Sequence, residues 1–206
     1  MTVVVVANPK GGAGKSTLAS NVAGFFASRG HSVALGDADL QQSARQWLGI
    51  RPPTVPAIQP WTVGVEEIAK PPKGIAHTVV DTPAGLDGKR LKSLLRMADR
   101  LLIPVQPSIF DIFATRDFLN TLADRPQAAK LKIALVGMRV DERTIASEHL
   151  ADFVASTGYP MAGTVRDTQT YVHLAAQGLT LFDVVASKFE RDLEMWQPIC
   201  DWLEND

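Results

Sequence analysis

Short apolar runs alternate with amphipathic stretches along most of the chain. Four consecutive valines, Val3 to Val6, are typical of a strand that is buried on both faces. Apolar residues then recur at helical spacing between Leu18 and Arg29, and Gly30 follows as a helix C-cap. These two patterns predict a buried strand and an amphipathic helix.

The alternation continues to the C-terminus, and it predicts an α/β fold with a mainly parallel twisted sheet covered by helices on both faces. We expect the further strands at residues 32–36, 77–81, 99–105, 131–138 and 159–165. We expect the further helices at residues 87–98 and 109–123, in a stretch ending near 157, within 166–177 and at 189–203. No repeat or linker divides the chain, so we expect one domain over residues 1–206.

Residues 51–60, which follow the second predicted strand, do not have the pattern of a regular helix or strand. Residues 51–60 hold four prolines, which rule out a regular helix or a central strand there. We therefore expect an extended surface segment, followed by a short helix over residues 63–70.

Two helices carry an apolar face that is expected to pack in the core. In the helix over residues 109–123 the inward positions are Ile112, Phe113, Leu119 and Leu122. In the last helix one face carries Phe189, Leu193, Trp196, Cys200 and Leu203. A stripe of this kind is more typical of core packing than of a binding surface.

The turn between the first strand and the first helix is rich in glycine and lysine. Its sequence from Lys10 to Thr17 is KGGAGKST, and its position after a strand and before a helix is typical of a phosphate-binding loop. Glycines let the backbone approach a phosphate closely, and the N–H groups at the helix start point into one concavity. Lys15 is expected to bind the β- and γ-phosphates, and the Ser16 hydroxyl to bind Mg²⁺. The strict G-x-x-x-x-G-K-[ST] pattern does not hold, because its first glycine falls on Pro9.

Three aspartates follow predicted strands, at the edge of an open parallel sheet where ligands bind. Asp37 and Asp39 leave the second strand together, and Asp81 ends the strand HTVVD. An aspartate that ends a buried strand in a nucleotide-binding fold is the usual Walker B arrangement, which holds the metal, often through water. The alternative interpretation of residues 37–39 is a polar strand-to-helix turn with a capping aspartate.

Composition limits the classes of function. The net charge is −1 over 206 residues, so any contact with nucleic acid requires a local basic patch. The single cysteine, Cys200, excludes an intrachain disulfide and suits a reducing cytosol. No apolar run approaches the ~20 residues that a membrane helix needs, so we expect a soluble, cytoplasmic protein.

The loop and the strand ends together resemble those of the ParA/MinD family of dimeric ATPases, which have a deviant Walker A loop and a P-loop NTPase-like fold. KGGAGKST is similar to that loop, DAD at 37–39 to the second acidic motif, and VVDTPAG at 79–85 to the Walker B segment. PVQPS at 104–108 and VDERT at 140–144 resemble later strand ends. Leu40 stands before Gln41 where the acidic motif usually has a proline, and Ala84 takes the place of a second proline in the Walker B segment. The resemblance is to the short ParA type, without an N-terminal helix-turn-helix extension.

The resemblance implies slow, Mg²⁺-dependent ATP hydrolysis that a partner stimulates. It places Asp37 and Asp81 around the water shell of a Mg²⁺ ion bound to Ser16, with Asp39 orienting the attacking water. It implies that Lys10 reaches across a dimer interface to the partner's nucleotide, as an arginine finger does. The remaining nucleotide contacts are expected from Gly11, Gly12, Ala13, Gly14, Lys15 and Thr17 and, for the base, from Met138, Arg139, Arg166 and Asp167.

The resemblance also implies partners. These are a second copy in an ATP-bound homodimer, DNA bound without sequence preference, and a ParB-like or cargo-adaptor protein, with the protein associated with the nucleoid. The basic residues proposed for the DNA contact are Arg143, Arg166, Lys188 and Arg191.

Three alternatives belong to other classes of protein. The MinD branch ends in a basic amphipathic helix that binds membrane, whereas the end here, DLEMWQPICDWLEND, is acidic and contains Pro198, so no membrane partner is expected. A metabolic P-loop enzyme of the dethiobiotin synthetase type would turn over small acceptor substrates. A nitrogenase iron protein-like reductase needs cluster-binding cysteines, which a single cysteine does not supply.

Overall fold

The computed structural model describes residues 1–39, 42–64, 69–86 and 88–205. Within these ranges the strands are β1 (Thr2–Val6), β2 (Val33–Asp37), β3 (Ile58–Thr62), β4 (His77–Asp81), β5 (Arg100–Val105), β6 (Lys132–Val140) and β7 (Met161–Arg166). The helices are α1 (Lys15–Ser28), α2 (Ser43–Gly49), α3 (Gly88–Met97), α4 (Ile109–Ala123), α5 (Ile145–Thr157), α6 (Thr170–Ala175) and α7 (Glu190–Glu204). Short 3₁₀ turns are η1 (Ala128–Lys130), η2 (Leu181–Asp183) and η3 (Ala186–Lys188).

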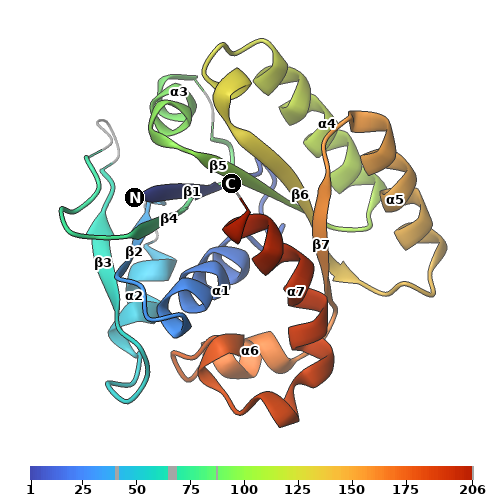
Figure 1. The fold of residues 1–206 in the computed structure, drawn as a ribbon. Coiled ribbons are helices and arrows are strands. Elements are labelled where there is room, and N and C mark those ends of the chain that lie inside the picture. Colours follow the sequence, from blue (N-terminus) through green and yellow to red (C-terminus); the bar gives the residue numbers. More distant parts are fainter. Residues whose placement is uncertain (40–41, 65–68, 87, 206) are drawn as a thin grey trace.

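The strands form one parallel sheet in the order β3-β2-β4-β1-β5-β6-β7, with helices on both faces (Figure 1). This confirms the predicted fold class.

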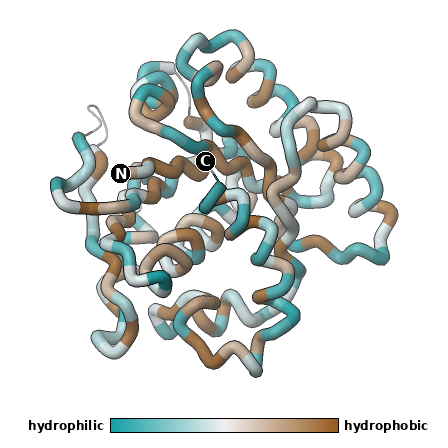
Figure 2. Tube along the Cα trace, in the orientation of Figure 1, coloured by the Kyte–Doolittle hydropathy of each residue, from teal (hydrophilic) through white to brown (hydrophobic). Residues whose placement is uncertain are grey.

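The valine run of β1 shows why the sheet has two covered faces. Val3 and Val5 belong to the core cluster under α3, α4 and α5, whereas Val4 and Val6 belong to the cluster under α1 and α7. Side chains of a strand alternate between faces, so an uninterrupted apolar run is stable only when both faces are buried. Figure 2 shows apolar positions along the strands at the centre of the molecule.

One expectation about the edge of the sheet needs correction, and another lies mainly outside the described residues. The proline-rich stretch does not end as an irregular segment, because Ile58 to Thr62 forms β3, which pairs in parallel with β2. Pro60 is compatible with β3 because an edge strand leaves one side of its backbone unpaired. The short helix expected over residues 63–70 falls mainly on residues 65–68, outside the described ranges, as do Leu40, Gln41 and Asp87.

The inward face of α4 also differs from the expectation. Ile112, Leu119 and Leu122 are buried, as predicted, but Phe113 is 45% exposed. Successive residues of a helix are rotated by about 100°, so Phe113 points away from the stripe that Ile112 begins.

The last helix packs its apolar face on the sheet, as predicted. Trp196, Cys200 and Leu203 of α7 are buried, and Phe189 and Leu193 pack against the same cluster. The helix continues through Pro198. No helix within the described ranges is long and apolar enough to span a bilayer.

The strand order brings the ends of distant segments together. β1 lies between β4 and β5, and β4 lies between β1 and β2. In the register of these pairs, Val6 is opposite Asp81, and Asp81 is opposite Asp37. The glycine-rich loop, Asp37 and Asp81 therefore leave the sheet side by side at the edge formed by the carboxyl ends of the strands, which we call the carboxyl edge.

Candidate nucleotide-binding site

The loop between β1 and α1 forms an open concavity at the carboxyl edge. Gly12 and Gly14 have φ angles of 76° and 93°, in the left-handed region that glycine adopts without strain. A Cβ atom on Gly14 would lie 2.9 Å from the terminal methyl of Met138, so a larger residue there would have to displace that side chain in addition to the backbone strain of its positive φ. This concavity, which we call the phosphate-sized cavity, has a volume of about 450 Å³, and the predicted residues that line it are Gly11, Gly12, Gly14, Lys15, Ser16, Thr17, Asp39 and Arg139. Ala13, within the loop, is buried.

The two lysines of the loop have different partners. Lys15 is buried, and its Nζ donates to the backbone oxygen of Lys10 at 2.7 Å. Burial lowers the pKa of Lys15, and the carboxylates of Asp81 and Asp39 oppose that shift. The Nζ of Lys10 instead contacts the carboxylate of Asp111 in the first turn of α4. Lys15 therefore lines the phosphate-sized cavity, and Lys10 is turned toward α4.

Asp81 ends β4 directly beside the loop and is 2% exposed. Burial raises its pKa to about 7, a hydrogen bond from the Ser16 hydroxyl opposes the shift, and the nearby Asp37 carboxylate adds to it. Among the described residues no group donates a hydrogen bond to Oδ1 of Asp81. A buried carboxylate with an unpaired oxygen beside a serine hydroxyl fits a hydrated Mg²⁺ ion.

Asp37 has a structural role in addition to its place near the loop. Its Oδ2 accepts backbone N–H groups from Ala44 at 2.8 Å and Arg45 at 3.3 Å, in the first turn of α2. Its Oδ1 accepts the N–H of Asp39 at 2.8 Å. The capping interpretation of this motif is therefore correct in geometry, and the predicted place of Asp37 in the water shell of a metal stays a prediction.

The carboxylates do not form a metal cage by themselves. Within the described ranges no three His, Cys, Asp or Glu side chains are arranged to hold a metal ion. Mg²⁺ ordinarily takes one or two carboxylates and completes its shell with water and substrate phosphates. A site made of Ser16, Asp81 and the phosphates of a bound nucleotide is consistent with this arrangement.

A second cavity of about 550 Å³ adjoins the loop. It shares Gly14, Thr17 and Arg139 with the phosphate-sized cavity, and the residues predicted to hold the base, Met138, Arg139, Arg166 and Asp167, all line it. Arg139 lies at an irregular point of β6 and has a φ angle of 54°, which is uncommon outside glycine. Strained backbone of this kind is concentrated at ligand sites. The two cavities together have room for a phosphate chain and a base.

The four basic residues predicted for DNA contact do not form one free cluster. Arg166 donates to both oxygens of Asp192, at 2.6 and 2.8 Å, and this pair holds β7 to α7. Arg143 pairs with Asp141 in its own loop and is highly exposed. Arg143, Arg166 and Arg191 line a common cavity, whereas Lys188 lies apart in η3.

Three side chains that hold the loop were missed by the sequence reasoning. Asn8 accepts the N–H of Lys10 at 2.8 Å and donates to Pro104 and Thr115. Gln106 donates to the backbone oxygen of Gly12 at 2.6 Å. Asp111 is the partner of Lys10 described above. The only available signals were the position of Gln106 in PVQPS and an acidic residue in the first helical turn, and neither identifies a contact with a loop about 100 residues away.

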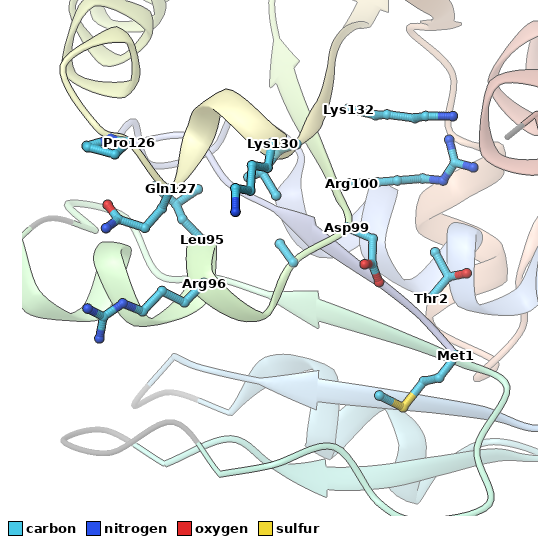
Figure 3. Close-up of a pocket in the computed structure, with 12 residues that line it drawn as sticks. Met1, Thr2, Leu95, Arg96, Asp99, Arg100, Pro126, Gln127, Lys130 and Lys132 are labelled. Carbon is cyan, nitrogen blue, oxygen red and sulfur yellow. The ribbon is translucent and has the colours of Figure 1, made fainter.

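The largest of the cavities described here is unrelated to the loop. Figure 3 shows this cavity, of about 780 Å³, at the opposite edge of the sheet, where Met1, Asp99, Arg96 and Lys130 lie along it. The Asp99 carboxylate already accepts the N–H of Val3 at 2.7 Å. None of the predicted site residues lines this cavity.

Asp81→Asn is expected to stabilise the nucleotide-free protein at pH 8. The folded-state pKa of Asp81, about 7, lies above its ordinary value of 3.8, so the folded state binds more protons than the unfolded state between these values. The free energy of unfolding therefore falls as pH rises through that window. Asparagine has no charge to desolvate, so the melting temperature of the variant should exceed that of the wild type at pH 8 and match it near pH 4.

Thermal melts of both proteins at the two pH values measure this effect. Asp117→Asn is a suitable control, because Asp117 is exposed on α4. A lower melting temperature for Asp81→Asn than for the wild type at pH 8 would show that Asp81 is stabilising in its ionised form.

Comparisons with known proteins agree with this geometry. A family model described as the CobQ/CobB/MinD/ParA nucleotide binding domain matches residues 4–195. The chain is 30% identical over 190 residues to the maintenance of carboxysome distribution protein A of Halothiobacillus neapolitanus, covering 89% of this chain and 88% of that protein. It is 33% identical over 138 residues to protein ParA of Rhizobium radiobacter, covering 65% and 62%.

Solved structures share the fold. The MinC:MinD cell division protein complex of Aquifex aeolicus matches with a TM-score of 0.79 at 18% identity, covering 100% of this chain and 96% of that one. Apo McdA of Cyanothece matches with a TM-score of 0.75 at 15% identity, covering 99% and 98%. The family model spans nearly the whole chain, including the loop and all three aspartates, and the chain therefore belongs to the CobQ/CobB/MinD/ParA nucleotide-binding family.

Proposed function

We propose that this protein is a Mg²⁺-dependent ATPase of the ParA type that positions a cargo inside the cell. ATP binding joins two copies, the dimer binds DNA without sequence preference, and a partner protein stimulates hydrolysis, which separates the copies. The relative in Halothiobacillus neapolitanus is named for carboxysome distribution, and the one in Rhizobium radiobacter is named ParA. The first of these names supports positioning as the role, and the cargo is proposed as a protein assembly or a DNA molecule.

The observation that carries this proposal is the divergence of the two loop lysines. Lys15 lies in the cavity of its own chain, where it can neutralise the β- and γ-phosphates. Lys10 has no such role there, because it is directed to Asp111 on α4. A loop lysine that does not serve its own cavity is suited to act on the nucleotide of a second copy. Phosphoryl transfer needs positioning and charge neutralisation more than covalent chemistry, and a cation supplied by a partner subunit provides both.

The remaining roles follow from the positions of the side chains. Ser16 and Asp81 would hold Mg²⁺, and the metal supplies charge neutralisation at the β- and γ-phosphate oxygens. Asp39 lines the phosphate-sized cavity, where its carboxylate would orient the attacking water. Asp37 fixes the backbone of Asp39 and thereby the position of that carboxylate.

Dimerisation is expected with ATP and not with ADP. Sedimentation velocity or light scattering on the protein with ADP, ATP and a slowly hydrolysed ATP analogue measures it. The analogue should give a stable dimer, whereas ADP should leave monomers, because only a γ-phosphate offers a charge for Lys10 of the partner copy. A protein that stays monomeric with the analogue would overturn the proposed function.

DNA binding by the ATP dimer is expected to depend steeply on salt. We propose three separate phosphate contacts in each copy, Arg143, Lys188 and Arg191, which dimerisation doubles. Arg166 is left out because Asp192 holds it partly buried, whereas Arg143 is 87% exposed although it pairs with Asp141. Two copies of three phosphate contacts give a log–log salt slope of about −5 on duplex DNA. Binding to duplexes of unrelated sequence, with ATP and with ADP, from low to moderate salt measures this slope.

A double variant, Lys188→Ala with Arg191→Ala, should reduce the magnitude of that slope by about 4, because it removes two contacts in each copy. Lys92→Ala on the exposed side of α3 is the matched control and should leave the slope unchanged. Tight binding without nucleotide, or no binding with ATP at low salt, would contradict DNA as the scaffold.

A further inference from the structure

The backbone leaves the sheet at the peptide unit between Ala38 and Asp39. Ala38 extends the pairing of β2 with β4 by one residue, because its N–H donates to the backbone oxygen of Asp81 at 2.9 Å. Its carbonyl accepts a hydrogen bond from the guanidinium of Arg90, in the first turn of α3. At the other end of the same peptide unit, the N–H of Asp39 donates to Oδ1 of Asp37 at 2.8 Å. Side chains therefore hold both polar groups of this unit.

These two hydrogen bonds orient the Asp39 side chain. A peptide unit is planar, so holding its C=O and its N–H fixes the orientation of the whole unit. That orientation restricts the directions in which the Cα–Cβ bond of Asp39 can point. Asp39 lines the phosphate-sized cavity, whereas Arg90 is not among the described residues that line it. Arg90 therefore influences the cavity through the backbone of Asp39.

The position of Arg90 is not explained by the stability of its own helix. The first turn of α3 contains Lys89 and Arg90 and no acidic residue. Cations are unfavourable near a helix N-terminus, where the unpaired N–H groups give a partial positive charge. The Nε of Arg90 is also buried, and no described residue accepts a hydrogen bond from it. Both features are destabilising, and local rules of this kind are broken most often at functional sites.

The segment that leads into α3 forms another wall of the phosphate-sized cavity. Thr82 and Ala84 line the cavity, as Asp39 does. The N–H of Gly85 donates to the backbone oxygen of Pro9 at 2.8 Å, which ties this segment to the glycine-rich loop. Through its bond to the carbonyl before Asp39, Arg90 connects the wall that follows β4 to the wall that follows β2.

We propose that Arg90 is a positioning residue for ATP hydrolysis, which holds the carbonyl of Ala38 and thereby keeps the Asp39 carboxylate aimed at the attacking water. This inference rests on the proposed function, which gives Asp39 that role. Arg90 acts through the backbone and does not need to contact the nucleotide. Without it the peptide unit before Asp39 loses one of its two anchors. A displacement of about 1 Å in a catalytic group can reduce a rate about 10²-fold.

Arg90→Met tests the proposal, because methionine keeps an unbranched stem but has no hydrogen-bond donor. Lys89→Met is the matched control, since it removes a positive charge from the same helical turn at an exposed position. Arg90→Met should lower the rate of single-turnover hydrolysis of radiolabelled ATP about 10- to 100-fold. Its affinity for a fluorescent, slowly hydrolysed analogue should stay within about twofold of the wild type, and Lys89→Met should change neither quantity. Hydrolysis by Arg90→Met at the wild-type rate would overturn the inference.

A double-mutant cycle distinguishes positioning of Asp39 from an independent structural role. If Arg90 acts through Asp39, adding Arg90→Met to Asp39→Asn should lower the rate by less than about twofold. An equal loss in both backgrounds would show that Arg90 acts independently of Asp39, and would overturn the inference alone. Hydrolysis by Asp39→Asn at the wild-type rate would overturn the role of Asp39 in the proposed function, and the inference with it.

Amide hydrogen exchange tests the geometry in the nucleotide-free protein. The N–H of Asp39 is protected by its bond to Asp37. Exchange of this amide, followed by NMR, should be at least about tenfold faster in Arg90→Met, because the peptide unit is then held at one end only. Lys89→Met should match the wild type. Unchanged exchange of the Asp39 amide in Arg90→Met would overturn the positioning role of Arg90, whatever the rate of ATP hydrolysis.

Discussion

Lys10→Ala is expected to abolish ATP hydrolysis while leaving ATP binding largely intact. A cation supplied to the transferring phosphoryl group by a partner subunit accelerates hydrolysis by about 10³–10⁵-fold in comparable systems. Lys10 does not line the cavity of its own chain, so its removal should change nucleotide affinity by no more than about threefold, whereas Lys15→Ala should weaken affinity by at least ~100-fold. Single-turnover hydrolysis and equilibrium binding of a fluorescent nucleotide separate the two effects.

The buried partner of Lys10 requires its own control. Lys10→Ala leaves the carboxylate of Asp111, whose side chain is 5% exposed, without its cation, and this can destabilise the fold by itself. The double variant Lys10→Ala with Asp111→Asn removes that charge. If hydrolysis returns in the double variant, the loss in the single variant was a folding effect and the lysine has no catalytic role.

Asp39→Ala is expected to bind ATP and to accumulate as a dimer with little turnover. Removing the group that orients or activates the attacking water reduces rates by about 10²–10⁴-fold. In the proposed cycle the two copies separate only after hydrolysis. The dimer of the variant with ATP should therefore last as long as the dimer of the wild type with the slowly hydrolysed analogue. Size measurement over time with ATP, together with the rate of phosphate release, tests this. Hydrolysis at the wild-type rate would move the role to another residue, and Asp37 is the next candidate.

Mixing the two variants decides whether Lys10 acts within one chain or across the interface. In a mixed dimer the Lys10→Ala copy keeps its own Asp39 and receives Lys10 from the Asp39→Ala copy, so one of its two sites is complete. Random pairing at equal concentrations makes half of the dimers mixed, so activity should recover to about a quarter of the wild-type value. If Lys10 served its own nucleotide, every site would lack one group and mixing would restore nothing.

These predictions depend on different amounts of structural information. Local sequence is sufficient for the glycine-rich loop, because glycines with positive φ, a preceding apolar strand and a following helix are all properties of neighbouring residues. Local sequence is also sufficient to predict that β1 is buried on both faces, because a run of valines has no polar side to expose to water.

Other assignments needed more than the local pattern. Both interpretations of Asp37 were open in the sequence, and only the backbone N–H groups of α2 show that it caps that helix. The prediction that Phe113 points inward was wrong. α4 has more apolar residues than its buried face can hold, and its packing against the sheet determines which of them are buried. β3 was missed as a strand, because an edge position removes the hydrogen-bonding requirement that otherwise keeps proline out.

By itself, the sequence determined the parallel α/β fold, the glycine-rich loop of residues 10–17 between a strand and a helix, and the aspartates at or just after the ends of β2 and β4, since each is encoded by the spacing of adjacent residues. Only the tertiary structure decided that β4 lies between β1 and β2, which places Asp37 and Asp81 in register. It also decided that α4 begins beside the loop, which pairs Asp111 with Lys10 and leaves Phe110 and Phe113 exposed nearby. The physical reason is that strand order and helix docking are fixed by the packing of two large cores formed from segments up to about 200 residues apart, and no pattern within one segment records which distant segment will be its neighbour.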